Sequence, residues 1–490
     1  MSYLLALAFG ALIPLSLAPF GWWPLGLVAI GGWFWLLQRS SSRGWLLGWL
    51  FGFGKYIVGV SWVYVSIHLY GGAPPLLAGF LVLLFAGGLA VFPMLNAWLF
   101  QRLRSGFAPQ FNAWLFVFLF VGFEWLLTWF LTGFPWLYPA YAHIDTALAG
   151  FAPIGGVLLV SFALVTSACF AVAGHLSQRK TALMIIAISP WVLGALLAQI
   201  NWVMPAARHS VVLVQGNIDQ AVKWLPDSRM PIIETYRALS EPYWGADLMI
   251  WPEAAITVMA HNADSVLEML DERAEQAQTA LVLGLPALER LPDGEIAFRN
   301  TAVGMGTAQG RYVKRRLVPF GEYVPLEGWL RGLIELFDLP MSHASPGARS
   351  QPLLRLAKGQ RAAMAICYEI IYPGLVREQA RRADVLITIS NDSWFGASIG
   401  PLQHLQMAQM RALENGRWLL RDTNNGVTAI VDHRGEIVSQ LPQFTADVLT
   451  GHYRQMLGNT PYSQFGEGPL LGVLGAGLLF GGWRRYRRGN

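Results

Sequence analysis

The sequence predicts an α-helical bundle that spans a membrane, joined to an α/β domain of layered helices and strands. Composition is the first reason: 54% of the 490 residues are hydrophobic and only 13% are charged, which is too apolar for a wholly soluble chain of this length. The second reason is the distribution of charge. Residues 1–200 hold seven Lys or Arg and two Asp or Glu, against 24 and 27 in residues 201–465. The chain therefore divides into an apolar part and a polar part.

Eight apolar stretches are long enough to cross about 30 Å of hydrocarbon. They lie at about residues 3–20, 22–38, 45–68, 76–100, 112–132, 153–174, 182–203 and 467–483. Lys and Arg occur in alternate connections, and the positive-inside rule then places both termini in the cytoplasm. The predicted division is a seven-span domain at 1–203, an outward-facing domain at 204–465, and a final span with a basic tail at 466–490.

Charge and cysteine content exclude several classes. The net charge of +5 comes from the membrane part, so the polar block lacks the basic excess that nucleic-acid binding requires. The two cysteines, Cys169 and Cys367, belong to different parts of the chain and predict no disulfide. The first residues lack a basic region, so no cleaved signal peptide is expected.

Two charged residues fall inside predicted spans, where an ionised group is usually paired or functional. For Lys55 and Glu124 we favour a buried pair or snorkelling side chains over a direct catalytic role. A proton-coupled transporter would also need such residues, which makes a transporter the rival from another class. Against it, the chain shows no internal repeat of the kind many carriers display.

Within 204–465, short apolar runs alternate with helical patterns, which predicts layered α/β packing. The strand-like runs are 211–215, 248–251, 281–285, 301–305, 362–366, 385–390 and 428–431. The helical patterns include 263–278, 373–382 and 402–415. The polar segment 432–435 between two strand-like runs predicts a hairpin turn.

Cys367 ends one of these apolar runs, and Pro373 is well placed as the first residue of a helix that follows. A thiol at such a junction is a candidate nucleophile, because a helix start favours negative charge. The alternative is an inert buried thiol, and from this residue alone the two interpretations weigh equally. The polar pair Tyr368 and Glu369 directly after the run favours a cleft.

Glu253 and Lys314 supply the other chemistry. Glu253 follows an apolar run and the rigid Trp251-Pro252 pair, so we expect a partly desolvated carboxylate with a raised pKa that serves as general base; the alternative is an ordinary surface Glu. Lys314 heads a basic triplet, which is usually a solvated face. A lysine close to a reacting carbonyl would stabilise an oxyanion.

Together these residues resemble the Glu-Lys-Cys triad of the nitrilase superfamily. The motifs around them resemble its membrane-embedded branch, the apolipoprotein N-acyltransferase family, over nearly the whole chain. The shared segments are 215–218 with 223–224, 251–253, 314–325, 366–369 and 391–396. Cys-Tyr-Glu alone would be a weak signal, but five motifs in order within this topology are strong.

The resemblance implies an extracytoplasmic αββα sandwich and an acyltransferase that matures lipoproteins. Cys367 would attack the sn-1 ester of a phospholipid, typically phosphatidylethanolamine, to give a thioester acyl-enzyme, with Glu253 as base and Lys314 with the Tyr368 backbone N–H at the oxyanion. The chain would then pass to the α-amino group of a diacylglyceryl-cysteine. Glu322 would orient Lys314, and Tyr368, Glu369 and Trp224 would shape the pocket. For Tyr368 and Trp224 the alternative is core packing, and for the two glutamates it is a structural ion pair.

The resemblance also implies a monomer in the inner membrane, with its catalytic domain in the periplasm and no metal or cofactor. His404, His433 and His452 lack metal-ligand spacing and are interpreted as surface or packing residues. Apolar residues at helical spacing in 329–337 predict either a mobile arm within 327–340 that dips into lipid or a packed core helix. A membrane-anchored amidase with the same triad is the rival enzyme.

Overall fold

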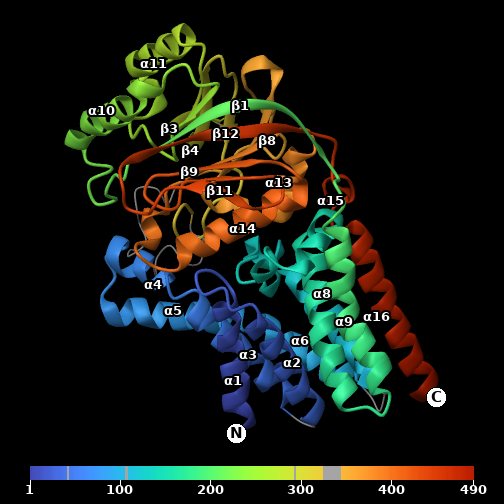
Figure 1. The fold of residues 1–490 in the computed structure, drawn as a ribbon. Coiled ribbons are helices and arrows are strands. Elements are labelled where there is room, and N and C mark those ends of the chain that lie inside the picture. The colour runs from blue at the N-terminus through green and yellow to red at the C-terminus, as the bar shows by residue number, and fades with distance from the viewer. Residues whose placement is uncertain (41–42, 105–108, 292–293, 324–343, 490) are drawn as a thin grey trace.

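The computed structural model describes the chain except residues 41–42, 105–108, 292–293, 324–343 and 490, and it places no side chains beyond 483. The predicted arm at 327–340 lies outside the described residues. A bundle of apolar helices carries a sandwich of two sheets, as Figure 1 shows. Both chain ends lie at the end of the bundle remote from the sandwich (Figure 1).

Each of the eight predicted spans contains a helix. The long helices of the bundle are α1 (Ser2–Ser16), α2 (Pro24–Arg39), α3 (Gly44–Gly59), α5 (Pro75–Leu89), α6 (Val91–Leu103), α7 (Pro109–Leu126), α8 (Ala152–His175), α9 (Lys180–Leu197) and α16 (Gly468–Gly489). Shorter turns are α4 (Val63–Val65), η1 (Ser66–Tyr70), η2 (Phe130–Thr132), η3 (Pro139–His143), η4 (Ala147–Phe151) and α15 (Pro461–Phe465).

Three helical stretches in the described part of the chain are long and apolar enough to cross a membrane: Pro75–Leu103, Ala147–His175 and Lys180–Leu197. A fourth is broken, because Gly44–Gly59 and Val63–Tyr70 meet at a bend of 61°. The last span before the sandwich was predicted to reach residue 203, but its helix ends at Leu197, ahead of polar Gln199 and Asn201. The apolar helices fit a multi-pass membrane protein, and the number of eight spans stays a prediction.

The polar part forms two six-stranded sheets. The first has the order β12-β1-β2-β3-β4-β5 and the second β11-β10-β9-β8-β7-β6. The strands of the first sheet are β1 (Met204–Gln215), β2 (Leu248–Ile250), β3 (Ala280–Arg290), β4 (Ile296–Gly306), β5 (Arg311–Val313) and β12 (Asp447–Leu457). Those of the second are β6 (Leu354–Arg355), β7 (Arg361–Ile366), β8 (Val385–Ser390), β9 (Leu419–Thr423), β10 (Ala429–Val431) and β11 (Ile437–Gln440).

The centre of each sheet is parallel. In the first sheet β1, β2 and β3 pair in parallel, and in the second β7, β8 and β9 do so. The carboxyl ends of parallel strands meet at one edge, where open α/β sheets bind their ligands. Glu253 follows β2, Cys367 follows β7 and Asn391 follows β8. The register therefore brings segments that are far apart in sequence to the same edge.

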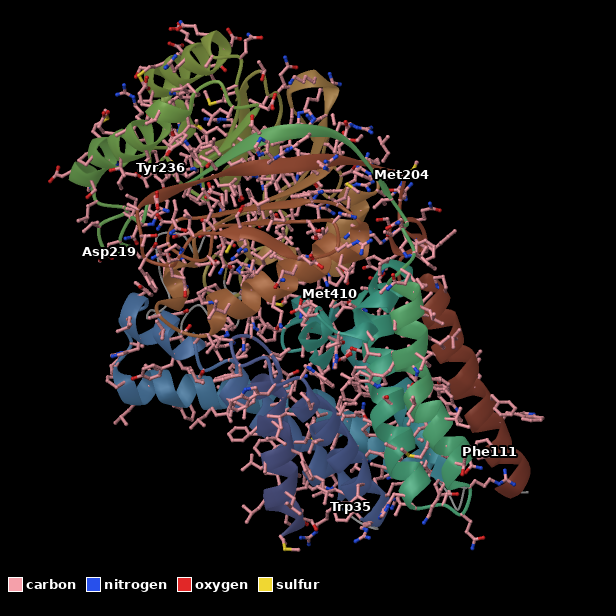
Figure 2. The ribbon with its side chains drawn as sticks, in the orientation of Figure 1. Trp35, Phe111, Met204, Asp219, Tyr236 and Met410 are labelled. Carbon is pink, nitrogen blue, oxygen red and sulfur yellow. The ribbon has the colours of Figure 1, made fainter. Side chains whose placement is uncertain are left out.

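Helices cover the outer face of both sheets. Helices α10 (Arg229–Ser240) and α11 (Asp264–Gln276) lie on the first sheet, and α13 (Pro373–Ala380) and α14 (Gly400–Asn415) lie on the second. This confirms the predicted αββα sandwich and the predicted hairpin turn between β10 and β11. Helix α14 also packs on α8, and Met410 lies at this junction of sandwich and bundle, as Figure 2 shows.

Candidate active site

Cys367 lies at the point where β7 gives way to a short 3-10 helix, η10 (Cys367–Ile371). Its φ is +54°, a left-handed conformation that a residue other than glycine keeps only when its surroundings hold it there. The side chain is 9% exposed. The Ser390 side chain, at the end of the neighbouring strand β8, lies close to the sulfur and favours its thiolate form. The thiol is therefore fixed in a strained turn and is nearly closed off from solvent.

Glu253 is buried, which excludes the ordinary surface glutamate that was the alternative. Its Oε1 atom accepts hydrogen bonds from Asn300 Nδ2 at 2.6 Å and from Lys314 Nζ at 3.1 Å. Its Oε2 atom accepts the Asn391 backbone N–H at 2.8 Å. Both carboxylate oxygens are thus held, and the group is oriented by three separate elements.

The expected rise in the pKa of Glu253 is wrong. Burial alone would raise it, but the charge of Lys314 and hydrogen bonds from Asn300, Lys314 and Asn391 hold the pKa of Glu253 below its ordinary value. The sequence placed the carboxylate in a desolvated site without revealing the donors around it. The resting carboxylate is therefore ionised at neutral pH.

Lys314 is not part of a solvated basic face. It is 1% exposed and lies between two carboxylates, with Nζ 3.1 Å from Glu253 Oε1 and 2.8 Å from Glu322 Oε1. Burial lowers the pKa of Lys314, but both glutamates and Cys367 raise it. The resulting pKa of Lys314 lies well above its ordinary value. Glu322 itself is fixed, because its Oε2 atom accepts the Val318 N–H at 2.8 Å.

The Cys367 thiol is protonated in the resting site. Burial raises its pKa most, the charges of Glu253 and Asp392 raise it further, and Lys314 and Ser390 oppose them without prevailing. Glu253, Lys314 and Cys367 are thus brought into one electrostatically coupled group. A neutral thiol beside an ionised carboxylate is the arrangement of a nucleophile with its general base.

Glu369 organises the site through backbone groups. Its oxygens accept N–H groups from Ile366 at 2.8 Å, Arg315 at 2.7 Å and Arg316 at 3.1 Å. A fourth hydrogen bond comes from the Tyr312 hydroxyl at 3.0 Å. One carboxylate therefore ties the strand that leads into Cys367 to the segment that carries Lys314, in place of the ion pair that was its alternative role.

The two aromatic residues predicted at the pocket differ in their surroundings. Tyr368 is buried, and its ring packs against Tyr372 with centroids 5.4 Å apart. Trp224 is half-buried, and its indole Nε1 atom makes no hydrogen bond with any described residue. Its neighbour Lys223 is buried and donates to the Glu253 backbone carbonyl at 3.2 Å. Burial lowers the pKa of Lys223 to about 8, although Glu253 opposes the shift.

A second polar network lies behind Cys367, and sequence reasoning missed it. His404 was interpreted as a surface or packing residue, but it is fully buried, with Nε2 3.2 Å from the Cys367 carbonyl oxygen and Nδ1 3.2 Å from Asp392 Oδ1. Arg421 Nη2 donates to Asp392 Oδ2 at 2.6 Å, and the Ser390 hydroxyl donates to Asp392 Oδ1 at 2.5 Å. The segment 391–396 marked Asp392, but no local pattern selects His404 or Arg421.

The turn after Cys367 touches the helical bundle. The indole of Trp136, which belongs to the bundle, lies 6.5 Å from the Tyr368 ring and 5.7 Å from the His404 ring, centroid to centroid. Trp136 Nε1 donates to Gln403 Oε1 at 2.7 Å. The Tyr372 hydroxyl donates to the Gly133 carbonyl at 3.2 Å. The candidate site therefore lies where the sandwich meets the apolar helices.

Comparison with known proteins finds relatives that match nearly the whole chain. The model of the apolipoprotein N-acyltransferase N-terminal domain matches residues 9–170, and the carbon-nitrogen hydrolase model matches residues 210–462. An apolipoprotein N-acyltransferase of Pseudomonas aeruginosa (strain UCBPP-PA14) is 46% identical over 98% of this chain and 95% of its own. An apolipoprotein N-acyltransferase of Azotobacter vinelandii (strain DJ) is 47% identical over 99% of this chain and 95% of its own.

Solved structures of the nitrilase superfamily are also similar to the second half of the chain. Nit3 of Saccharomyces cerevisiae, a member of branch 10 of that superfamily, matches with a TM-score of 0.39 and 18% identity. The match covers 51% of this chain and 90% of Nit3. The family model over residues 210–462 and the two-sheet topology together assign a nitrilase-like α/β fold to this half.

Proposed function

The chain belongs to the apolipoprotein N-acyltransferase family and is an acyltransferase, and from this premise we propose how its own residues carry the reaction. The acyl donor is a phospholipid, with phosphatidylethanolamine as the expected species and the sn-1 ester as the reacting bond. The acceptor is the α-amino group of the N-terminal diacylglyceryl-cysteine of an apolipoprotein. Cys367 carries the acyl chain between them as a thioester.

In the first half-reaction Glu253 takes the proton of the Cys367 thiol, and the sulfur attacks the ester carbonyl. The Lys314 ammonium and the Tyr368 backbone N–H stabilise the oxyanion that forms. The carbon–oxygen bond to glycerol then breaks, and Glu253 returns its proton to the departing oxygen. The products are a thioester on Cys367 and a lysophospholipid.

In the second half-reaction the acceptor amine attacks the thioester carbonyl. Glu253 removes a proton from the attacking nitrogen, and the tetrahedral intermediate collapses with cleavage of the carbon–sulfur bond. The proton held by Glu253 passes to the thiolate, so the resting thiol is restored. An amide replaces the thioester, and the enzyme is ready for another donor.

One observation carries this proposal: the buried Glu253 carboxylate and the buried Lys314 ammonium lie 3.1 Å apart, and both act electrostatically on the buried thiol that follows β7. The ammonium cannot act as base while its pKa is held high, so the roles of acid–base group and oxyanion partner divide between Glu253 and Lys314. Glu322 keeps Lys314 charged and in place through the 2.8 Å contact. Glu369 fixes the turn that presents Cys367, and Tyr368 and Trp224 line the acyl pocket.

We also propose how the chain sits in the cell. The domains are 1–203, 204–465 and 466–490, with eight spans in the inner membrane, the sandwich in the periplasm and both termini in the cytoplasm. This agrees with two termini at one end of the bundle and the sandwich at the other (Figure 1). A single chain holds the whole triad, and we propose that it acts as a monomer. The contact of the Trp136 ring with the Tyr368 ring supports this arrangement, because it joins the turn that carries Cys367 to the apolar part of the chain.

Intact mass spectrometry of the purified protein with phosphatidylethanolamine tests the thioester. The proposal predicts one added acyl chain on Cys367, absent from Cys367→Ala and formed more slowly by Glu253→Gln. Addition of a diacylglyceryl-cysteine peptide should release the adduct as an N-acylated peptide. Release as free fatty acid at the same rate with and without peptide would indicate a hydrolase with the same triad, and would overturn the proposal.

A further inference from the structure

A cavity lies at the junction of sandwich and bundle, away from Cys367. It measures about 300 Å³ and is lined by the segment 197–203 at the end of α9, by the segment around η4, and by the β10–β11 hairpin turn. Leu413 of α14 also lines it, nine residues beyond His404. At 1.5 Å per residue these two positions are about 14 Å apart along the helix. The volume is at the lower end of the range of small-ligand pockets.

The mouth of this cavity is polar and carries both signs of charge. Arg434 is exposed there and donates from Nη2 to Asn201 Oδ1 at 2.9 Å. Asp145 and Glu436 also line the cavity and are exposed. With one arginine against two carboxylates, a ligand that is only anionic meets repulsion. A ligand with a cationic and an anionic group finds a partner for each.

Two buried polar atoms of lining residues form no hydrogen bond with any residue that the structure describes. They are Trp202 Nε1 and His433 Nδ1, and the second lies 4.0 Å from Asp432 Oδ2. Buried polar atoms are nearly always satisfied, by protein or by something bound. A ligand headgroup or its water in this cavity would supply the missing partners. The cavity thus combines exposed charges at its mouth with a buried indole N–H that has no acceptor among the described residues.

The cavity lies at the end of an apolar helix. Leu197 and Ile200 line it, and α9 exposes apolar side chains along its length. These side chains include Ile188, Val192, Leu193 and Leu196, each more than half exposed. Side chains of this kind on a membrane helix contact lipid chains. A polar mouth at the end of an apolar helix has the shape of an amphiphile.

We propose that this cavity holds the headgroup of a zwitterionic glycerophospholipid. Its phosphate pairs with Arg434, its ammonium pairs with Asp145 and Glu436, and its acyl chains lie along α9. The bound lipid is a structural lipid that contacts both the β10–β11 hairpin and the end of α9. It is a different molecule from the acyl donor at Cys367. The inference needs α9 to contact lipid, and it does not rest on the proposed reaction.

The test counts lipid retained by the full chain in native mass spectrometry after detergent exchange, with Cys367→Ala present so that no lipid is consumed. Phosphatidylethanolamine and phosphatidylglycerol of matched chains are offered in equal amounts. Retention should favour phosphatidylethanolamine by roughly threefold, which is the scale of one exposed ion pair. Glu436→Lys should reverse the preference, while the matched control Glu268→Lys, on exposed α11, should leave it unchanged.

A second measurement separates this site from catalysis. With Cys367 intact, Glu436→Lys should form the acyl adduct at the parental rate. Equal retention of the two lipids, or the same change from Glu268→Lys, would overturn the inference. Loss of the adduct together with the lipid preference would also overturn it, because the cavity would then be the donor site. Failure of adduct formation in the parent protein would instead count against the proposed reaction alone.

Discussion

The Nε2 atom of His404 lies 3.2 Å from the backbone carbonyl oxygen of Cys367, across a separation of 37 residues. Burial and the nearby Arg421 charge lower the pKa of His404 against the opposing charge of Asp392. The neutral ring that results donates from Nε2 to the carbonyl. This bond fixes the residue whose φ is +54°. His404 thus positions the nucleophile through its backbone and does not exchange protons with the substrate.

Loss of this bond should slow acylation without weakening substrate binding. His404→Ala is expected to lower kcat by about 10- to 100-fold, the scale seen when a supporting residue is removed from a site, with KM within about twofold. His404→Gln keeps an N–H donor on a side chain of similar reach, and should recover part of the rate. Steady-state acyl transfer to a lipopeptide measures both constants.

The same comparison includes Asp392→Asn, which removes the charge that pairs with Arg421, the residue whose Nη2 atom lies 3.1 Å from His404 Nδ1 and donates to it. Its effect on kcat should equal or exceed that of His404→Ala. A KM effect of the same size as the kcat effect would contradict a positioning role, because it would mean that substrate binding was lost.

The Glu253 charge should set the acidity of the Cys367 thiol. The Glu253 charge raises the pKa of the thiol, whereas the Lys314 charge lowers it. The Glu253→Gln variant removes the first effect and keeps the second, so the thiol pKa should fall. Alkylation of Cys367 by iodoacetamide, in a Cys169→Ala background, should therefore reach its midpoint at lower pH in Glu253→Gln than in the parent. Acyl transfer by the same variant should fall by about 100-fold or more, because the base is gone.

The Lys314→Met variant should shift the alkylation midpoint of Cys367 in the opposite direction. Without the ammonium, the alkylation midpoint should move to higher pH, since Glu253 and burial then act without opposition. Shifts of equal sign in the two variants would contradict the electrostatic assignment. Circular dichroism on both proteins establishes that the fold is retained.

The pKa of Glu253 also predicts how stability depends on pH. A carboxylate whose pKa is depressed in the folded state stabilises that state at every pH above its unfolded pKa of about 4.3, and loses the contribution as pH falls through the folded pKa. The direction applies here because Lys314, Asn300 and Asn391 depress the pKa of Glu253. The difference in unfolding midpoint between the parent and Glu253→Gln should be constant at neutral pH and shrink below about pH 4. Thermal unfolding in detergent across this range measures it.

Much of the fold follows from local patterns in the sequence. Apolar runs ending before Cys367, Glu253 and Asn391 predicted three strands, and the structure has β7, β2 and β8 there. Three of the strands that were missed, β5, β6 and β12, lie at the sheet edges. For example, β6 has two residues, and only three of the eleven residues of β12 are buried. The central strand β9 was missed because Arg421 and Asp422, both buried, interrupt its apolar run. Pairing with a partner far along the chain fixes such strands, and a local window contains no sign of it.

The site was predictable only to the level of its motifs. A motif marks which residues carry chemistry, but the pKa of Glu253 depends on Asn300 of β4 and on Lys314, which directly follows β5. For the same reason His404 was unremarkable in sequence, because its partner, the Cys367 carbonyl, belongs to a different segment. Long-range contacts decide these electrostatic properties, so they emerge only with the fold.

The buried charges of the bundle give the last prediction. Lys55 and Glu124 are 5% and 4% exposed and line one cavity of about 30 Å³ together with Asn96, so two opposite charges share one buried space. Removing one partner of a buried pair costs about 3–5 kcal/mol, whereas replacing both by apolar residues is often close to neutral. Lys55→Met should therefore destabilise the protein more than the double variant Lys55→Met with Glu124→Leu does. Urea unfolding in detergent measures the difference, and acyl transfer by the double variant should stay near the parental rate because neither residue contacts the triad. Loss of acyl transfer in a folded double variant would contradict this prediction. It would show that Lys55 and Glu124 have a functional role, as the transporter alternative requires.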